Sequence, residues 1–99
     1  MTLWYHPAAV IEAMEAALYY DQQAPGLGRR FERALEDAER TILEAPERWP
    51  RHIAQTRRYR LKRFPYGVVY RVQSDAIGIF AVMHLKRRPG YWMHRMPAE

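Results

Sequence analysis

The chain has 99 residues, a formal net charge of +5 and no cysteine. A chain of this length needs one continuous core, so we expect a single domain over residues 1–99. The lack of cysteine excludes disulfides and thiolate metal sites, and no secretory signal or long apolar span is present, so the sequence predicts a cytoplasmic protein that does not enter a membrane.

The charge is divided unevenly between the two halves of the chain. Residues 1–50 hold five Lys or Arg and nine Asp or Glu, a net charge of −4, whereas residues 51–99 hold eleven and two, a net charge of +9. Aromatic residues are interleaved with the cations of the second half. This pattern predicts a nucleic acid or an acidic protein as partner, with a solvated basic face as the alternative.

The N-terminal half predicts a strand followed by two helices. Leu3 to His6 is an aromatic-rich run before Pro7, which suits a short strand and then a first helical turn. The first helix is expected to reach about Gln23, with a core-facing stripe of Val10, Ala13, Met14, Ala17 and Leu18.

A break at residues 24–28, Ala-Pro-Gly-Leu-Gly, predicts a tight reversal into a second helix that ends near Glu44. We expect the charged residues of this helix to be solvated surface. Its core stripe comprises Leu27, Phe31, Leu35, Ala38 and Ile42. Pro46 and Pro50 flank Trp49 and prevent the helix from continuing.

The C-terminal half predicts three strands. In the first, Tyr59 and Leu61 alternate with the cations Arg58, Arg60 and Lys62, as in a half-buried strand. Phe64 to Gly67 reads as a turn, and the next strand ends near Gln73. Its inner face is predicted to carry Val68, Tyr70 and Val72, opposite Val69 and Arg71.

The third strand, residues 77–85, is apolar on both faces, which indicates a position covered on both sides. We assign Ile77, Ile79, Ala81, Met83 and Leu85 to one face and Phe80 and Val82 to the other. The residues expected to be buried between the helical and sheet layers are Phe31, Leu35, Ile42, Tyr70, Ile79 and Ala81. The predicted fold is therefore α+β: an N-terminal strand, a two-helix hairpin and a three-stranded antiparallel meander.

The order and spacing of five segments resemble the RelE/ParE superfamily of toxins from type II toxin-antitoxin systems. The segments are His6-Pro7, Tyr19-Tyr20 with residues 25–28, residues 46–50, residues 63–72 and residues 82–92. The resemblance implies the two-layer RelE-like fold, with the first strand beside the last. It also implies a cognate acidic antitoxin as partner in a hetero-oligomer.

The two branches of this superfamily imply different activities. One branch cleaves mRNA on the ribosome, and it often carries an Arg directly before its Leu-Val-Tyr or Val-Tyr strand core. This chain has Gly67 before Val68-Val69-Tyr70. The other branch inhibits DNA gyrase by binding, and the resemblance is closer to this ParE-like branch. A metal-independent endoribonuclease and a non-toxic basic binding module are the alternatives, so whether the protein is an enzyme stays open.

Candidate site residues lie in the basic half. General acid/base chemistry on a phosphate needs groups that converge on one point, and the candidates are Lys62, Arg63, His84, Arg87 and Tyr91. Contacts to a target or antitoxin are expected from Arg58, Arg60, Lys62, Lys86, Arg87, Arg88, Tyr91 and Trp92. A packing role for Trp92 and edge protection by the Arg58 strand are the structural alternatives. The four histidines show no metal-ligand spacing, and no metal or cofactor is expected.

Overall fold

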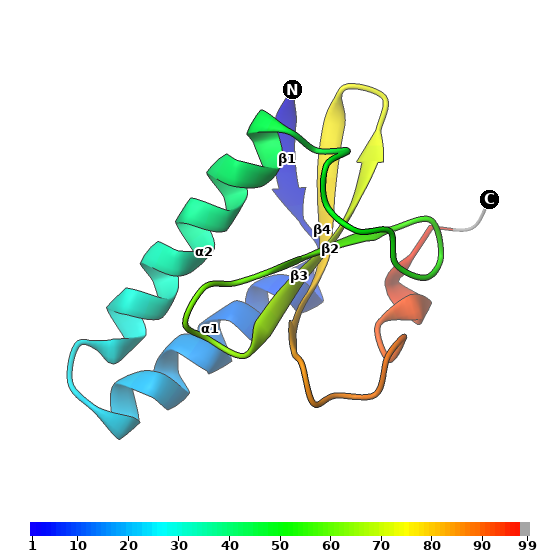
Figure 1. The fold of residues 1–99 in the computed structure, drawn as a ribbon. Coiled ribbons are helices and arrows are strands. Elements are labelled where there is room, and N and C mark those ends of the chain that lie inside the picture. Colours follow the sequence, from blue (N-terminus) through cyan, green and yellow to red (C-terminus); the bar gives the residue numbers. More distant parts are fainter. Residues whose placement is uncertain (98–99) are drawn as a thin grey trace.

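The elements follow the predicted order in the computed structural model, which describes residues 1–97. They are β1 (Thr2–Tyr5), α1 (Pro7–Gln23), α2 (Leu27–Glu44), β2 (Arg57–Arg60), β3 (Tyr66–Gln73), β4 (Ala76–His84) and a 3-10 turn, η1 (Met93–Arg95). The helices form a hairpin on one side of the sheet, and the C-terminal segment lies on the other (Figure 1). The predicted α+β class is confirmed.

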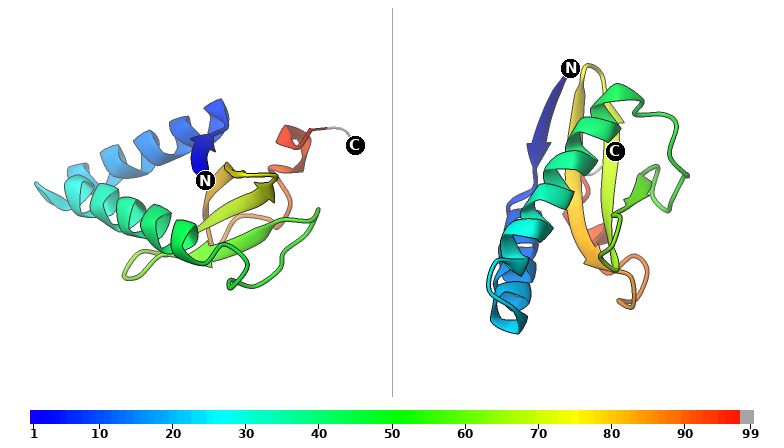
Figure 2. Two further views of the ribbon diagram at one scale, coloured as in Figure 1. Left: turned by 90° about the horizontal axis from the view of Figure 1, so that it is seen from above. Right: turned by 60° about the vertical axis from the view of Figure 1, so that its left-hand side comes forward.

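The sheet has the strand order β1-β4-β3-β2. β2, β3 and β4 form the antiparallel meander, and β1 pairs parallel to β4 with Leu3 opposite Ile77. The position of β1 beside the last strand, which the family resemblance implied, is confirmed. Seen from above, α1 and α2 lie along one face of the twisted sheet (Figure 2).

Local hydrogen bonds fix the ends of the two helices. The Nδ1 of His6 accepts a hydrogen bond from the Ala8 N–H at 3.0 Å and caps α1. Asp21 accepts hydrogen bonds from the N–H groups of Gly26 and Gly28 at 3.0 and 3.3 Å, which ties α1 to the start of α2. Gly26 has a φ of 87°, a left-handed conformation that glycine adopts without strain, so the reversal between the helices is short.

The core stripe predicted for α1 is wrong for its large side chains. Val10, Met14 and Leu18 are 41, 65 and 61% exposed, whereas Ala9 and Ala16 are buried. α1 and α2 approach closely near Gly28, where an added Cβ would overlap the Ala17 carbonyl, so small residues face inward at that end of the hairpin. Close packing through alanines turns the bulkier apolar side chains outward.

The stripe predicted for α2 is largely confirmed. Phe31, Leu35, Ala38 and Ile42 are buried, and Leu27 is partly buried. These side chains pack against the inner face of the sheet around Val68, Tyr70, Ile77 and Ile79. The six residues predicted to be buried are all buried.

One of those six, Ala81, is buried on the other face of the sheet. β3 pairs Val69 with Ala81 but Tyr70 with Ile79, so β4 carries an extra residue, Phe80, at this point. A bulge of one residue reverses the faces on either side of it. Ala81 therefore packs with Val69, Met83 and Trp92 in a second core cluster. The assignment of Ala81 and Met83 to the same face as Ile77 and Ile79 is wrong, and Val82 packs with Ile77 and Ile79 instead.

The turn between β2 and β3 lies earlier than predicted. The connection covers residues 61–65, and Tyr66 and Gly67 already belong to β3. Leu61 donates its N–H to the Tyr66 carbonyl at 2.9 Å, and Arg63 takes a left-handed φ of 72°. None of the helices within residues 1–97 is long and apolar enough to cross a membrane.

Candidate functional site

A groove of about 1000 Å³ runs between α2 and the β2–β3 connection. We call it the basic groove because five of its lining side chains are cations: Arg30, Arg33, Arg40, Lys62 and Arg63. Asp37 is its only acidic lining residue and pairs with Arg40. The other four cations form no salt bridge with any residue of the described part of the chain, 1–97. The groove therefore carries uncompensated positive charge.

The floor of the basic groove is apolar. It includes Tyr20, Leu27, Ala34 and Phe64, all of which are partly buried. Tyr20 stacks on Phe31 and meets Phe64 edge-on, with ring centroids 5.6 and 4.9 Å apart. The floor is therefore a packed aromatic surface that continues into the core.

A second group of side chains ties the C-terminal segment to α1. We call Glu12, Arg87, Tyr91 and Arg95 the C-terminal cluster. Arg95 forms a two-pronged ion pair with Glu12, with both N···O distances at 2.9 Å, and the Tyr91 hydroxyl donates to Glu12 at 2.6 Å. The Arg87 guanidinium lies 3.7 Å from the centre of the Tyr91 ring.

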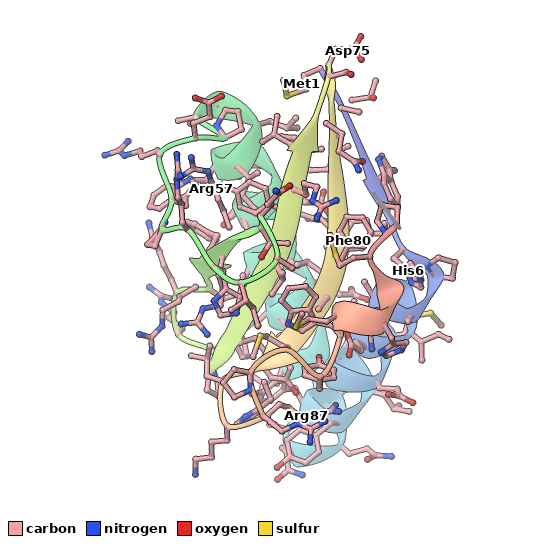
Figure 3. The ribbon with its side chains drawn as sticks, turned by 90° about the vertical axis from the view of Figure 1, so that its right-hand side faces the viewer. Met1, His6, Arg57, Asp75, Phe80 and Arg87 are labelled. Carbon is pink, nitrogen blue, oxygen red and sulfur yellow. The ribbon has the colours of Figure 1, made fainter. Side chains whose placement is uncertain are left out.

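The C-terminal cluster also supplies hydrogen-bond partners to the backbone at an open edge of the sheet. β1 pairs with β4 only as far as Ile79, so the backbone groups beyond that residue lack a strand neighbour there. Glu12 accepts the Val82 N–H at 3.0 Å, and Arg95 donates to the Phe80 carbonyl at 3.0 Å. Two charged side chains thus occupy hydrogen-bonding positions that another strand would otherwise take. Figure 3 views this face of the sheet, with the C-terminal turn lying across it.

The electrostatics of the C-terminal cluster favour an ionised Glu12 and a neutral Tyr91. Burial alone would raise the pKa of Glu12, but hydrogen bonds from Arg95, Tyr91 and the Val82 N–H outweigh it and lower that pKa. Burial and the hydrogen bond to Glu12 raise the pKa of Tyr91. The Tyr91 hydroxyl is therefore held as a donor to Glu12.

His84 lies at the exit of β4. Its ring meets Tyr66 edge-on at 5.1 Å between centroids, and its Nδ1 accepts the Lys86 N–H at 3.1 Å. Lys86, Arg87 and Arg88 follow on the exposed loop at the same end of the molecule, where Arg87 is labelled in Figure 3. The His84 side chain thus stabilises the turn that follows β4.

Arg58 and Arg60 project from β2 near a small pocket of about 270 Å³ that Trp49 and His52 also line. Burial and the nearby charge of Arg58 lower the pKa of His52. A Cβ added to Gly67 would lie 3.0 Å from the aliphatic carbons of Arg58. The Arg58 side chain therefore lies across Gly67, in the space that a larger residue would fill.

The residues proposed for acid/base chemistry are divided between different surroundings. Lys62 and Arg63 line the basic groove, whereas Arg87 and Tyr91 belong to the C-terminal cluster. Within residues 1–97, no hydrogen bond, ion pair or ring contact joins the two pairs. Trp92, predicted as a partner contact, is fully buried in the second core cluster. The structure corrects that assignment in favour of the packing alternative.

Several residues of these sites were not identified from the sequence. Arg30, Arg33 and Arg40 were interpreted as solvated surface, although their spacing places them along one side of α2. Glu12 and Arg95 are 83 positions apart, and no local pattern signals their pairing. The Arg spacing could have revealed the groove, but only the fold reveals the ion pair.

Comparison with known proteins identifies the family. The model of a family described as "ParE toxin of type II toxin-antitoxin system, parDE" matches residues 4–89. A solved structure titled "Chromosomal ParDE TA system from P. aeruginosa" has a similar fold, with a TM-score of 0.75 and 15% sequence identity. The match covers 85% of this chain and 95% of that chain. No curated protein matches the sequence.

The family match extends over most of the chain, so the protein belongs to the ParE toxin family, within the RelE/ParE superfamily. The predicted resemblance, including its closeness to the ParE-like branch, is confirmed.

Proposed function

We propose that this ParE-family toxin acts by stoichiometric binding, with DNA gyrase as its target, and that a cognate acidic antitoxin neutralises it in the cytoplasm. Its hetero-oligomer with the antitoxin is the inactive form. The protein needs no cofactor or metal for such an activity, because inhibition by binding uses surface complementarity alone.

The observation that carries this proposal is that Tyr91 is held in contacts with Glu12 and Arg87. Its hydroxyl donates to Glu12 at 2.6 Å, and its ring is covered by Arg87. A catalytic proton donor must reach the leaving oxygen of the substrate, and the raised pKa of Tyr91 makes proton transfer harder. The strongest acid/base candidate beyond β4 is thus committed to a structural contact.

The surroundings of Gly67 support the same conclusion. The ribonuclease branch often places an Arg directly before its Leu-Val-Tyr or Val-Tyr core. In this chain Gly67 precedes Val68-Val69-Tyr70, and the aliphatic part of Arg58 lies over Gly67. Lys62 and Arg63 line the basic groove instead of joining His84 or Tyr91. Acid/base catalysis at one phosphate requires its catalytic groups to converge on that phosphate, and these side chains do not.

Electrostatics support the acidic partner. The second half of the chain carries +9, and the basic groove adds three arginines from the otherwise acidic first half. An acidic antitoxin would be steered to this surface, so its association rate should fall as the salt concentration rises.

Two parallel assays test the target. The purified toxin is added to a gyrase supercoiling reaction and to ribosomes translating a defined mRNA. Inhibition of supercoiling with intact mRNA is expected. Cleavage of the mRNA, abolished by Tyr91→Phe or His84→Ala, would refute the binding mechanism and favour the endoribonuclease. Absence of both effects, with no growth arrest on expression, would leave the non-toxic binding module.

A further inference from the structure

A further cationic surface lies on the segment that leads into β2. Residues 47–60 hold five arginines and one acidic residue, Glu47. We call the five the arginine edge: Arg48, Arg51, Arg57, Arg58 and Arg60. None of them forms a salt bridge within the described residues, 1–97. This surface is distinct from the loop after β4, because Arg57 and Arg87 lie well apart in Figure 3.

Two neighbouring pockets bring these arginines together. Arg51, Arg58 and Arg60 line the pocket of about 270 Å³ beside Trp49. Arg51 also lines a pocket of about 260 Å³, together with Arg57 and with Arg71 of β3. Because Arg51 belongs to both pockets, the side chains form one continuous row. From Arg57 to Arg60, β2 extends over roughly 10 Å at about 3.3 Å per residue.

The backbone along this row is already hydrogen-bonded to the segment before β2. The Arg58 N–H donates to the Pro50 carbonyl at 3.1 Å. Arg51 pairs with Arg57 in an isolated antiparallel bridge. A peptide strand therefore cannot add to the outer edge of β2 at these positions, and what the edge offers a partner is the charge of its side chains.

The aromatic rings beneath the arginines are packed against their neighbours. Trp49 meets the buried Tyr59 edge-on with ring centroids 4.7 Å apart, and the Arg48 guanidinium lies 5.3 Å from the centre of the Trp49 ring. The Arg57 guanidinium donates to the Trp49 carbonyl at 2.7 Å, which holds it in place and leaves its other N–H groups available. Little apolar surface is left for the side chains of a protein partner, whereas phosphate groups need only the guanidinium donors.

We propose that the arginine edge binds the phosphate backbone of duplex DNA. About three successive phosphates of one strand, which are about 3.4 Å apart along the helix axis, match the length of β2 from Arg57 to Arg60. Contacts of this kind do not read the base sequence. The choice of DNA over RNA rests on the proposed function, since DNA gyrase itself acts on duplex DNA. A toxin bound to gyrase would contact the DNA through this edge and the enzyme through another surface.

Fluorescence anisotropy with a fluorescein-labelled duplex of about 20 base pairs, two helical turns, tests the proposal directly. Two double variants lose equal charge: the edge variant, Arg51→Gln with Arg60→Gln, and a control variant, Arg30→Gln with Arg88→Gln. The control residues lie in the basic groove and in the loop after β4, so they sample other exposed cationic regions. All four residues are exposed, so both variants should fold normally, as circular dichroism can verify.

Three phosphate contacts predict a slope of about −3 when the logarithm of the binding constant is plotted against that of the salt concentration, or roughly a 50-fold loss of affinity between about 50 and 200 mM salt. The edge variant should lose about 2 from the magnitude of this slope, and the control variant should keep it. Equal changes in both variants would reduce the effect to net charge and overturn the proposal. No binding at low salt, or tighter binding of polyglutamate or an RNA duplex than of the DNA duplex, would also overturn it.

The DNA dependence of gyrase binding separates this inference from the proposed function. Duplex DNA should raise the affinity of the unmodified protein for purified gyrase in surface plasmon resonance, and the edge variant should lose this gain while it still binds gyrase without DNA. If the unmodified protein binds gyrase but not DNA, the arginine edge fails and the proposed function stands. If it binds DNA but not gyrase, the proposed target fails and the DNA-binding edge stands.

Discussion

Removing the charge of Glu12 is expected to destabilise the whole domain. The Glu12 carboxylate accepts four hydrogen bonds, from the Val82 N–H, the Tyr91 hydroxyl and both terminal nitrogens of Arg95. These bonds join α1, β4 and the C-terminal segment at one point. Glu12→Gln keeps the shape of the side chain but places an amide NH₂ where some of these donors point.

The size of the effect follows from burial. The side chains of Arg95 and Glu12 are 9 and 13% exposed, so little water can replace the lost contacts. Breaking a buried ion pair costs about 3–5 kcal/mol, and hydrogen bonds to charged groups contribute about 1.5–3 kcal/mol each. Because the amide still makes some of these bonds, we expect a loss of roughly 2–4 kcal/mol, or a fall in Tm of roughly 10–20 °C.

Urea unfolding followed by tryptophan fluorescence measures this loss. A double-mutant cycle of Glu12→Gln and Arg95→Met should give a coupling free energy of about 1–3 kcal/mol. Arg40→Met is the matched control, since it removes an ion pair whose side chains are 67 and 66% exposed, and it should cost less than about 0.5 kcal/mol. If Glu12→Gln and Arg95→Met each cost no more than this control, the C-terminal cluster does not stabilise the fold.

Three further predictions concern stability. The pKa of Glu12 is lower in the folded state than its ordinary value of 4.5, so the unfolded state binds more protons between the two values, and the contribution of Glu12 should be full above pH 4.5 and disappear as the pH falls through the folded pKa. Acid titration of the unfolding free energy should show a shallower slope in Glu12→Gln. Trp92→Ala should cost about 3–5 kcal/mol in urea unfolding because the ring is fully buried, whereas Met14→Ala, at a side chain 65% exposed, should cost less than about 0.5 kcal/mol. Gly28→Ala should lower stability by about 1–3 kcal/mol in thermal melts, because its Cβ would overlap the Ala17 carbonyl, and an unchanged Tm would show that the helices separate without cost.

Periodicity predicted those parts of the fold in which one residue pattern continues without interruption. The α2 stripe from Phe31 to Ile42 repeats regularly, and its large side chains are the buried ones. The same reasoning was wrong for α1, because apolar residues occur on more than one side of that helix. Packing then selects the alanines, since only small side chains allow the close approach at Gly28.

Irregularities of the sheet could not be read from the sequence. The extra residue at Phe80 leaves no trace in a run that is apolar on both faces, so Ala81 was assigned to the wrong side. The turn before β3 was placed at Phe64 to Gly67 because Pro65 and Gly67 favour turns. Arg63 adopts the left-handed conformation instead, and Gly67 lies within β3.

The candidate site residues were found by their chemistry, but their surroundings depend on contacts between distant parts of the chain. Lys62 and Arg63 were identified as cations, yet the groove that they line needs α2, whose arginines looked like ordinary surface. Tyr91 was identified as a possible acid, yet its actual partner is Glu12. A short list of reactive side chains therefore does not decide between catalysis and binding.

The C-terminal segment illustrates how the same residue types can support opposite functions. A Tyr, an Arg and a His after the last strand would provide the groups for cleaving RNA if they pointed into one cavity. In this chain Glu12 binds both Tyr91 and Arg95, and the same carboxylate accepts the Val82 N–H at the open edge of β4. A single acidic side chain on α1 thus holds Tyr91, the one catalytic candidate of this pair, in a contact that supports the fold. The exposed cations of the basic groove are not part of this contact, which is consistent with the proposed action by binding.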